Sequence, residues 1–243
     1  MKKFLPIILF VLGLVVLVLV YFFVIKSPKK TNLIEDDTTS LIEVSLNDRP
    51  IVSLTPTSDG HWLNLKIEKI KIPGAYSMDY ELLYDLPDGR TQGVPGSITL
   101  NGQTLIEREL LLGSESSGKF RYDEGVEIGT MTVRFRNEKG KLIARFTTKF
   151  ALLSNTKELV SVDEAFTATL SKSAKGYFVV METFGIPKDA PSDVKSGPYG
   201  LFYSEETTLS GEAQLGTYTT YMYKGTDWAK DSFDSGIFIG LEE

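Results

Sequence analysis

The chain contains a single histidine, His61, in the segment Thr57-Ser-Asp-Gly-His-Trp62. A catalytic triad would require this histidine to meet a nucleophilic serine and an acid in space. A histidine that directly follows a turn is more often a solvated residue at the end of a strand, and one histidine cannot form a histidine cluster around a metal. We therefore predict no catalytic role and no metal for His61.

The pattern Ser-x-x-Lys occurs at Ser27/Lys30, Ser116/Lys119, Ser154/Lys157 and Ser192/Lys195. In penicillin-binding enzymes this pattern places a lysine beside a nucleophilic serine on a helix. None of the copies lies in a segment that predicts a helix, and the accompanying Ser-Asp-Asn and Lys-Thr-Gly elements are absent. Gly89, Gly93 and Gly96 lack the spacing of a phosphate-binding loop. The sequence predicts no enzyme, no catalytic residue and no cofactor.

Two acidic groups could offer oxygen ligands to calcium, namely Asp123, Glu124 and Glu127, and Asp227, Asp231 and Asp234. Neither group matches an EF-hand loop, and solvated charge near turns is the simpler interpretation. The acids of the second group are spaced i, i+4 and i+7, so on a short helix they would share one face and repel each other. We predict no metal site in either group.

Aromatic side chains are concentrated in the last quarter of the chain, at Tyr199, Phe202, Tyr203, Tyr218, Tyr221, Tyr223 and Trp228. Rings that carry a hydroxyl suit both the core of a sandwich and a platform for stacking sugars. On a strand, Tyr221 and Tyr223 share one face and Tyr218, Thr220 and Met222 share the other, so one set should face water. The core is the expected place for most of these rings, and a ligand-binding face is predicted around Tyr221, Tyr223 and Trp228.

The element that positions the whole chain is an uncharged run of 22 residues from Phe4 to Ile25. As a helix this run would be about 33 Å long, which is enough to cross a hydrocarbon core of about 30 Å. The bulky residues Tyr21 to Ile25 occupy the positions where a signal peptidase needs small side chains, and the chain has no cysteine to be lipidated. Residues 1–25 are therefore predicted to be a cytoplasmic tip and an uncleaved transmembrane helix, with the lipid bilayer as partner.

Lysines flank this run on both sides, so the positive-inside rule hardly distinguishes the two orientations. The short segment before the run and the acidic stretch that starts at Glu35 favour a cell-membrane protein with a single span and most of its chain outside the cytoplasm. Residues 31–243 contain 21 basic and 32 acidic residues, a formal charge of −11. A nucleic acid would need clustered basic residues, so we predict no nucleic-acid partner.

The rest of the chain predicts β-structure. Residues 26–47 have the composition of a juxtamembrane linker, and from Pro50 onward the dominant hydrophobic period is two, as in 62–68, 76–84 and 131–136. Asn101-Gly102 predicts a type I′ hairpin between 97–100 and 103–112, and Pro87-Asp88-Gly89 and 137–140 predict two further turns. The sequence favours an antiparallel β-sandwich over residues 48–155.

Residues 156–243 are predicted to form a second, smaller β-rich unit, although they could instead extend the first into a single domain. The expected strands are 166–170, 177–184, 199–204, 212–224 and 237–241, and residues 226–234 are expected to form one or two helical turns. Because there is no cysteine, both units must rest on their hydrophobic cores, without disulfides.

The segment from Gly129 to Ile143 resembles the closing F and G strands of immunoglobulin-like and fibronectin-III-like modules in membrane-anchored bacterial envelope proteins. Tyr122, a few residues earlier, is similar to the tyrosine corner of such domains. The resemblance implies an Ig-like β-sandwich and carries no catalytic content.

Two functions remain open at this point. The favoured one is a non-enzymatic envelope protein that presents its β-domains for adhesion, scaffolding or assembly with envelope proteins or glycans. The alternative is an extracytoplasmic module that binds a sugar or peptide through the aromatic residues of the C-terminal unit. A concave pocket or a contiguous aromatic patch on that unit would favour ligand binding, whereas featureless polar faces would favour scaffolding.

Overall fold

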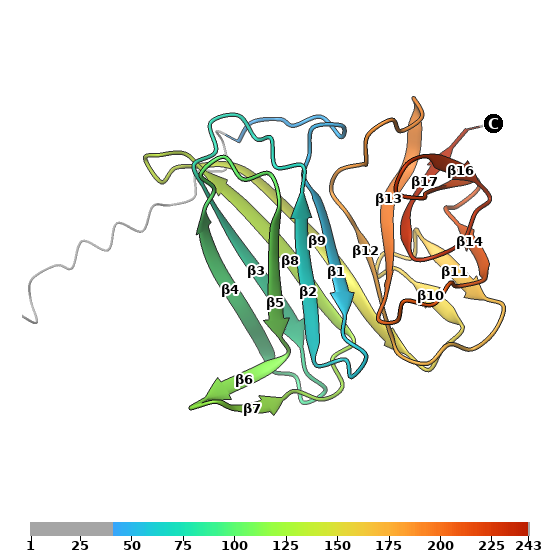
Figure 1. Ribbon diagram of the computed structural model, residues 1–243, viewed down its shortest axis with the longest axis horizontal. Coiled ribbons are helices and arrows are strands. Elements are labelled where there is room, and N and C mark those ends of the chain that lie inside the picture. Colours follow the sequence, from blue (N-terminus) through green and yellow to red (C-terminus); the bar gives the residue numbers. More distant parts are fainter. Residues whose placement is uncertain (1–40, 243) are drawn as a thin grey trace, which may run out of the picture. The chain divides into compact units, whose positions relative to one another are not determined.

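The computed structural model describes residues 41–242, which form antiparallel β-sheets and contain no helix (Figure 1). The prediction of a mainly β fold is confirmed for this part of the chain. The predicted transmembrane helix and most of the predicted linker lie outside the described residues. Within residues 41–242, no helix has the length and apolar character that a membrane span requires.

The strands of the described part are, in chain order, β1 (Ile51–Pro56), β2 (Trp62–Glu68), β3 (Ser77–Asp85), β4 (Thr91–Thr99), β5 (Ile106–Leu111), β6 (Gly113–Ser116), β7 (Lys119–Tyr122), β8 (Ile128–Arg136), β9 (Leu142–Ser154), β10 (Glu158–Val160), β11 (Thr167–Leu170), β12 (Tyr177–Glu182), β13 (Val194–Tyr203), β14 (Gly211–Gln214), β15 (Thr219–Tyr223), β16 (Trp228–Lys230) and β17 (Gly236–Leu241).

One long sheet of nine strands runs through the described part, in the order β16-β15-β17-β13-β12-β9-β8-β3-β4. Two three-stranded sheets, β1-β2-β5 and β10-β11-β14, and the two-stranded ribbon β6-β7 complete the fold (Figure 1). The sheet β1-β2-β5 packs on the half of the long sheet that contains β3, β8 and β9, and β10-β11-β14 packs on the half that contains β13, β15 and β17.

The two small sheets cover opposite faces of the long sheet, as the alternation along β12 shows. Val179 and Met181 belong to the core beneath β1-β2-β5, whereas Phe178 and Val180 belong to the core beneath β10-β11-β14. Successive side chains of a strand point to opposite faces. We call the face that carries Val179 the first face and the face that carries Phe178 the second face.

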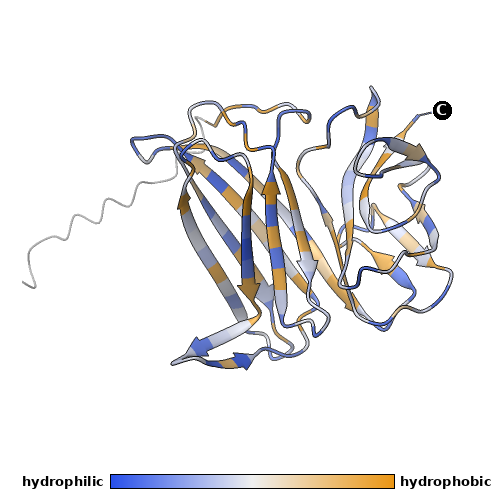
Figure 2. Ribbon diagram, viewed as in Figure 1, coloured by the Kyte–Doolittle hydropathy of each residue, from blue (hydrophilic) through white to orange (hydrophobic). Residues whose placement is uncertain are grey.

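The period-two patterns in the sequence correctly identify the buried side of several strands. Leu63, Leu65 and Ile67 of β2 are each at most 1% exposed, and the polar residues between them are more exposed. The predicted alternation in β3 and β8 is also confirmed, and the bands of alternating hydropathy are visible along these strands in Figure 2. In β2, β3 and β8, the order of apolar and polar residues therefore predicts which face is buried.

The turns confirm two predictions and correct a third. The loops at Pro87-Asp88-Gly89 and at 137–140 join β3 to β4 and β8 to β9. Asn101 and Gly102 have the positive φ angles, 47° and 78°, expected for a type I′ turn. The predicted hairpin is nevertheless wrong, because β4 pairs with β3 in the long sheet, whereas β5 pairs with β2 in a small sheet. The turn carries the chain from one layer to the other.

Two predictions in the C-terminal part are also wrong. The expected helical turns at 226–234 are replaced by β16 and a loop, because Trp228 to Lys230 pair with β15. The expected strand at 212–224 is divided into β14 and β15, which lie in different sheets and are separated by a tight turn at Leu215–Tyr218. Gly216, with φ 62°, provides the left-handed backbone that this turn needs.

Strands on both sides of residue 155 share the long sheet, since β9 and β12 are hydrogen-bonded neighbours. The described residues belong to one compact unit. The division into domains at this residue stays a prediction. Antiparallel sheets alone do not identify an immunoglobulin-like or fibronectin-III-like module, so that assignment also stays a prediction.

Candidate functional site

The three residues predicted for ligand binding lie on the neighbouring strands β15 and β16. Tyr221 and Tyr223 alternate with the buried Thr220 and Met222, and therefore point to the first face of the long sheet. Tyr223 is paired with Trp228 in the register of the two strands, and the centroids of their rings are 5.3 Å apart. All three predicted residues are half-buried.

The Tyr223 hydroxyl and the Trp228 indole nitrogen differ in their hydrogen bonding. The Tyr223 hydroxyl donates a hydrogen bond of 2.6 Å to the carbonyl of Gly225, which fixes the ring at the end of β15. The indole Nε1 of Trp228 is buried and has no acceptor within the described part of the chain. The phenol is thus held in place by the backbone, and the indole is held by packing.

Tyr223 lines a groove of about 980 Å³, which is larger than the two other cavities described below. Its lining comes from the first residue of β1, the end of β2 and the turn after it, and the loop after β12. The strands β13, β15 and β17, and residues 208, 224–225 and 232–235, complete it. Tyr221 and Trp228 are absent from the lining, so the structure brings one of the three predicted residues into the groove. Trp228 supports Tyr223 from the neighbouring strand.

The groove exists because β1-β2-β5 covers only half of the first face. The small sheet ends at β1, whose edge is joined to the segment after β12 by hydrogen bonds from Val52 N to Thr183 O and from Gly185 N to Pro50 O, both 3.0 Å. Beyond this edge, the first face of β13, β17 and β15 carries Phe202, Ile237 and Tyr223 without a covering sheet. These apolar and aromatic side chains contribute to the floor of the groove.

The uncovered half of the second face has a different character. There, Arg134 and Arg136 of β8 form ion pairs with Glu81 and Asp79 of β3, at 3.0 and 2.6 Å. A charged surface of this kind is what a sheet face presents to water. The uncovered half of the first face is apolar and aromatic instead, which is typical of ligand-binding clefts.

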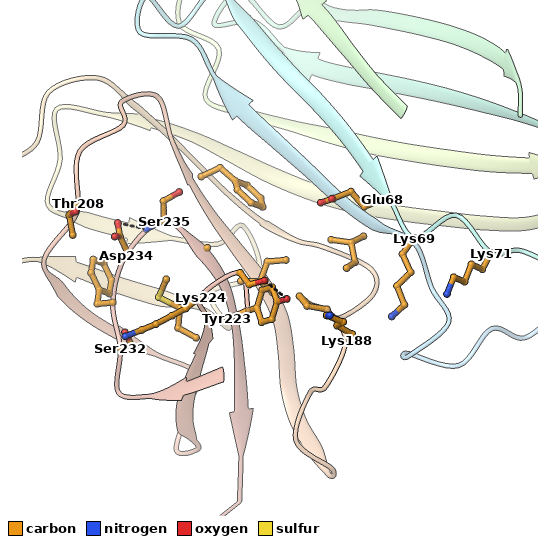
Figure 3. Close-up of a pocket in the computed structure, with 18 residues that line it drawn as sticks. Glu68, Lys69, Lys71, Lys188, Thr208, Tyr223, Lys224, Ser232, Asp234 and Ser235 are labelled. Carbon is orange, nitrogen blue, oxygen red and sulfur yellow. Dashed lines mark hydrogen bonds between the residues drawn. The ribbon is translucent and has the colours of Figure 1, made fainter. Parts of the chain in front are cut away.

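Lysines provide most of the charge in the groove. Lys69, Lys71, Lys188 and Lys224 line it, against two acids, Glu68 and Asp234. Figure 3 shows Lys69, Lys71 and Lys188 on one side of Tyr223, and Thr208, Ser232, Asp234 and Ser235 on the other.

Both acids of the groove are already partnered. Glu68 forms an ion pair of 2.9 Å with Lys66, and the Asp234 carboxylate accepts hydrogen bonds from the backbone N–H groups of Leu209 and Ser235. Their negative charge is therefore partly compensated by these partners. The groove presents a net positive surface.

Lys69 also has a structural role. Its Nζ donates a hydrogen bond of 2.8 Å to the carbonyl of Ile186, which ties the turn after β2 to the loop after β12. Burial lowers the pKa of Lys69, Asp48 acts to raise it, and the neighbouring Lys71 lowers it further. We call Lys69, Lys71 and Lys188, which lie on one side of Tyr223, the lysine wall. Within this wall, the hydrogen bond to Ile186 fixes the position of Lys69.

His61 borders a second cavity, of about 390 Å³, which Asp123, Glu124 and Glu127 also line. The His61 ring stacks on Tyr122 of β7, with centroids 4.0 Å apart, and its Nδ1 lies 3.3 Å from Asp59 Oδ2. Tyr122, which the sequence likens to a tyrosine corner, is 37% exposed in the ribbon. Across residues 41–242, no three acids or histidines come together in a way that could hold a metal ion.

A third cavity, of about 270 Å³, contains a half-buried polar cluster at the second face. The Tyr199 hydroxyl donates a hydrogen bond to Asp163, and Ser161 donates another. Burial acts to raise the pKa of Asp163, but the hydrogen bonds from Ser161, Tyr199 and the backbone outweigh it, so this pKa is lowered. Burial raises the pKa of the nearby Glu182, with Arg49 opposing the shift.

In comparisons with known proteins, no family model, no curated protein and no solved structure matches this chain. Sequence reasoning found Tyr223 through the alternation of rings in β15, but it assigned neither Phe202 nor any lysine to the site. Lys69, Lys71 and Lys188 come from distant parts of the chain, whereas Lys224 directly follows Tyr223. Local signals existed in Lys69-Ile-Lys71, where two lysines follow a strand, and in Lys224 beside Tyr223.

Proposed function

We propose that the protein is a membrane-anchored, non-enzymatic protein of the cell envelope whose β-structure binds a ligand in the groove beside Tyr223. The observation that carries this proposal is the uncovered apolar and aromatic half of the first face, enclosed by β1 and the loop after β12 into a groove of about 980 Å³. A volume of several hundred Å³ with an apolar floor and a few polar groups is usual for a ligand pocket. A protein that served only as a scaffold would not need to leave this face uncovered.

The first test uses the tryptophan next to the groove. The chain has two tryptophans, and Trp228 packs against Tyr223. The full chain carrying Trp62→Phe would be studied in neutral detergent, where its tryptophan fluorescence comes from Trp228. A bound ligand should change the intensity or wavelength of this fluorescence. A panel of neutral and acidic oligosaccharides and short peptides would be titrated and followed by this signal.

Tyr223→Ala should weaken binding of whichever panel member responds by about five- to tenfold, because ring stacking contributes on the order of 1 kcal/mol. Tyr76→Ala is a matched control, since Tyr76 is 48% exposed and lines none of the cavities described above. If no panel member responds, or if both variants bind equally well, the groove is not the ligand site.

The predicted topology has a separate test. The chain has no cysteine, so Ser116→Cys at the exposed tip of the β6-β7 ribbon introduces a unique thiol. We expect this thiol to react with a membrane-impermeant maleimide in intact cells. Reaction only after lysis would place residues 41–242 in the cytoplasm and contradict the proposal.

A further inference from the structure

The groove concentrates positive charge in a part of the chain that is acidic as a whole. Residues 31–243 carry a formal charge of −11, yet the groove is lined by four lysines and two acids. The lysines outnumber the acids, and Glu68 is also paired with Lys66, so the groove keeps an excess of positive charge. A cleft lined by one sign of charge raises the local concentration of a ligand of opposite charge.

Three of these lysines have no ionic partner within residues 41–242. No carboxylate of the described part forms an ion pair with Lys71, Lys188 or Lys224, and all three are exposed. Exposed lysines on their own are ordinary. Here, however, the turn after β2, the loop after β12 and the end of β15 bring them to the same cleft from three separate parts of the chain.

The other side of the groove carries hydroxyl groups. Thr208, Ser232 and Ser235 line it together with Lys224, and Tyr223 lies between this side and Lys69, Lys71 and Lys188 (Figure 3). Hydroxyls can both donate and accept hydrogen bonds, as the hydroxyls of a sugar do. The face of a tyrosine ring offers an apolar surface on which a sugar ring can stack.

We propose that the ligand of this groove is an acidic saccharide, in which a carboxylate or phosphate group lies beside Lys69, Lys71 and Lys188 while a sugar ring lies over Tyr223 toward the hydroxyl-bearing side. This inference rests on the proposed function of the groove and adds the chemical class of its ligand. A neutral sugar would leave the lysine wall without a counterpart. A simple anion would leave Tyr223 and the hydroxyls without one.

The test compares ligands that differ only in charge, using the full chain in neutral detergent at low ionic strength. The probes are a glucuronic acid oligosaccharide, the neutral glucose oligosaccharide of the same linkage and length, glucose 6-phosphate with glucose as its neutral counterpart, and inorganic phosphate alone. We expect an acidic sugar to bind at least about tenfold more tightly than its neutral counterpart, and this difference to shrink as salt is raised. The carboxylate and phosphate arms distinguish the two possible anionic groups.

The variant Lys71→Gln/Lys188→Gln removes two exposed lysines of the wall and keeps the Lys69 hydrogen bond to Ile186. It should weaken binding of the acidic sugar by about three- to tenfold, because exposed charge pairs contribute modestly, and should leave binding of the neutral sugar unchanged. The control Lys139→Gln/Lys172→Gln makes the same change in net charge at two exposed lysines outside the groove, and should have no effect.

The outcomes separate this inference from the proposed function. Equal affinity for the acidic and neutral sugars, or tight binding of inorganic phosphate alone, would overturn the inference while the groove remained a binding site. An equal loss of affinity in the groove variant and the charge-matched control would also overturn it, because only general electrostatics would be acting. Failure of every panel member to bind would reject the proposed function itself.

Discussion

Asp163 and Glu182 are carboxylic acids that line the same small cavity but have pKa values shifted in opposite directions. Hydrogen bonds from Ser161 and Tyr199 favour the charged form of Asp163 despite its burial. The pKa of Glu182 is raised mainly by burial, and the attraction to Arg49 offsets this only in part. A lowered carboxyl pKa stabilises the folded state above the ordinary pKa of the group, and a raised one destabilises it there. At neutral pH, the ionisation of Asp163 therefore stabilises the folded state, and the ionisation of Glu182 destabilises it.

Because its pKa is raised, Glu182 binds its proton more tightly in the folded state than in the unfolded state. Its unfavourable contribution is fully present above the folded-state pKa and disappears as pH falls toward the ordinary value. We therefore expect Glu182→Gln to raise the melting temperature at pH 7 and to give little change near pH 4. Thermal denaturation at several pH values would measure this, with the exposed Glu212→Gln as control. A melting temperature lowered at pH 7 would show that the attraction to Arg49 outweighs burial.

Single residues also mark where sequence reasoning reaches its limit. The alternation in β15 was enough to place Tyr223 opposite the buried Met222, because the period of a strand is local information. The lysine wall could not be anticipated in the same way, since Lys69 and Ile186, which it contacts, are 117 residues apart. Contacts of this range depend on how the sheets are layered, and no short window of sequence contains that information.

At the scale of elements, the shape of the groove floor depends on a glycine in β13. A Cβ at Gly200 would lie 2.3 Å from the ring of Phe202, and a methyl of Thr183 would be 2.9 Å away. The absence of a side chain at Gly200 lets the Phe202 ring lie flat along the strand, where it lines the groove and packs against the first core.

Gly200→Ala should therefore displace the Phe202 ring and destabilise the protein by about 1–3 kcal/mol, the usual cost of overpacking. Gly93→Ala in β4 is a suitable comparison, because its nearest neighbour, at 2.9 Å, is the flexible end of the partly exposed Leu83. Urea denaturation would measure both variants. A cost for Gly200→Ala no greater than that for Gly93→Ala would mean that Phe202 can move aside freely.

The elements also show why strands were easier to predict than their pairing. The residues Asn101 and Gly102 adopt the positive φ angles that their types favour, yet the strands on either side join different sheets. Turn chemistry fixes the local direction of the chain, and the partner of each strand is decided by which apolar faces can be buried together. The same reason divides 212–224 into β14 and β15, which cover the second core from its two sides.

For the described part as a whole, the notable feature is that one sheet supports two cores. The strand β12 contributes to both, with neighbouring residues pointing to opposite faces. Removing residues after 155 would take β12 away from β9 and remove Val179 and Met181 from the first core. We therefore expect residues 41–242 to unfold as one cooperative unit.

Val179 and Val180 provide a matched test of this expectation. Both are fully buried, both lie on β12, and each belongs to a different core. Truncation of a buried valine to alanine should cost about 2 kcal/mol, from the lost transfer energy and the cavity that remains. In a single cooperative transition, Val179→Ala and Val180→Ala should shift the same midpoint by similar amounts, because each core stabilises the whole sheet.

Differential scanning calorimetry of the full chain and of both variants would measure this. Two separate transitions, of which Val179→Ala lowers one and Val180→Ala the other, would show that the halves of the sheet unfold independently, and would favour two domains divided near residue 155.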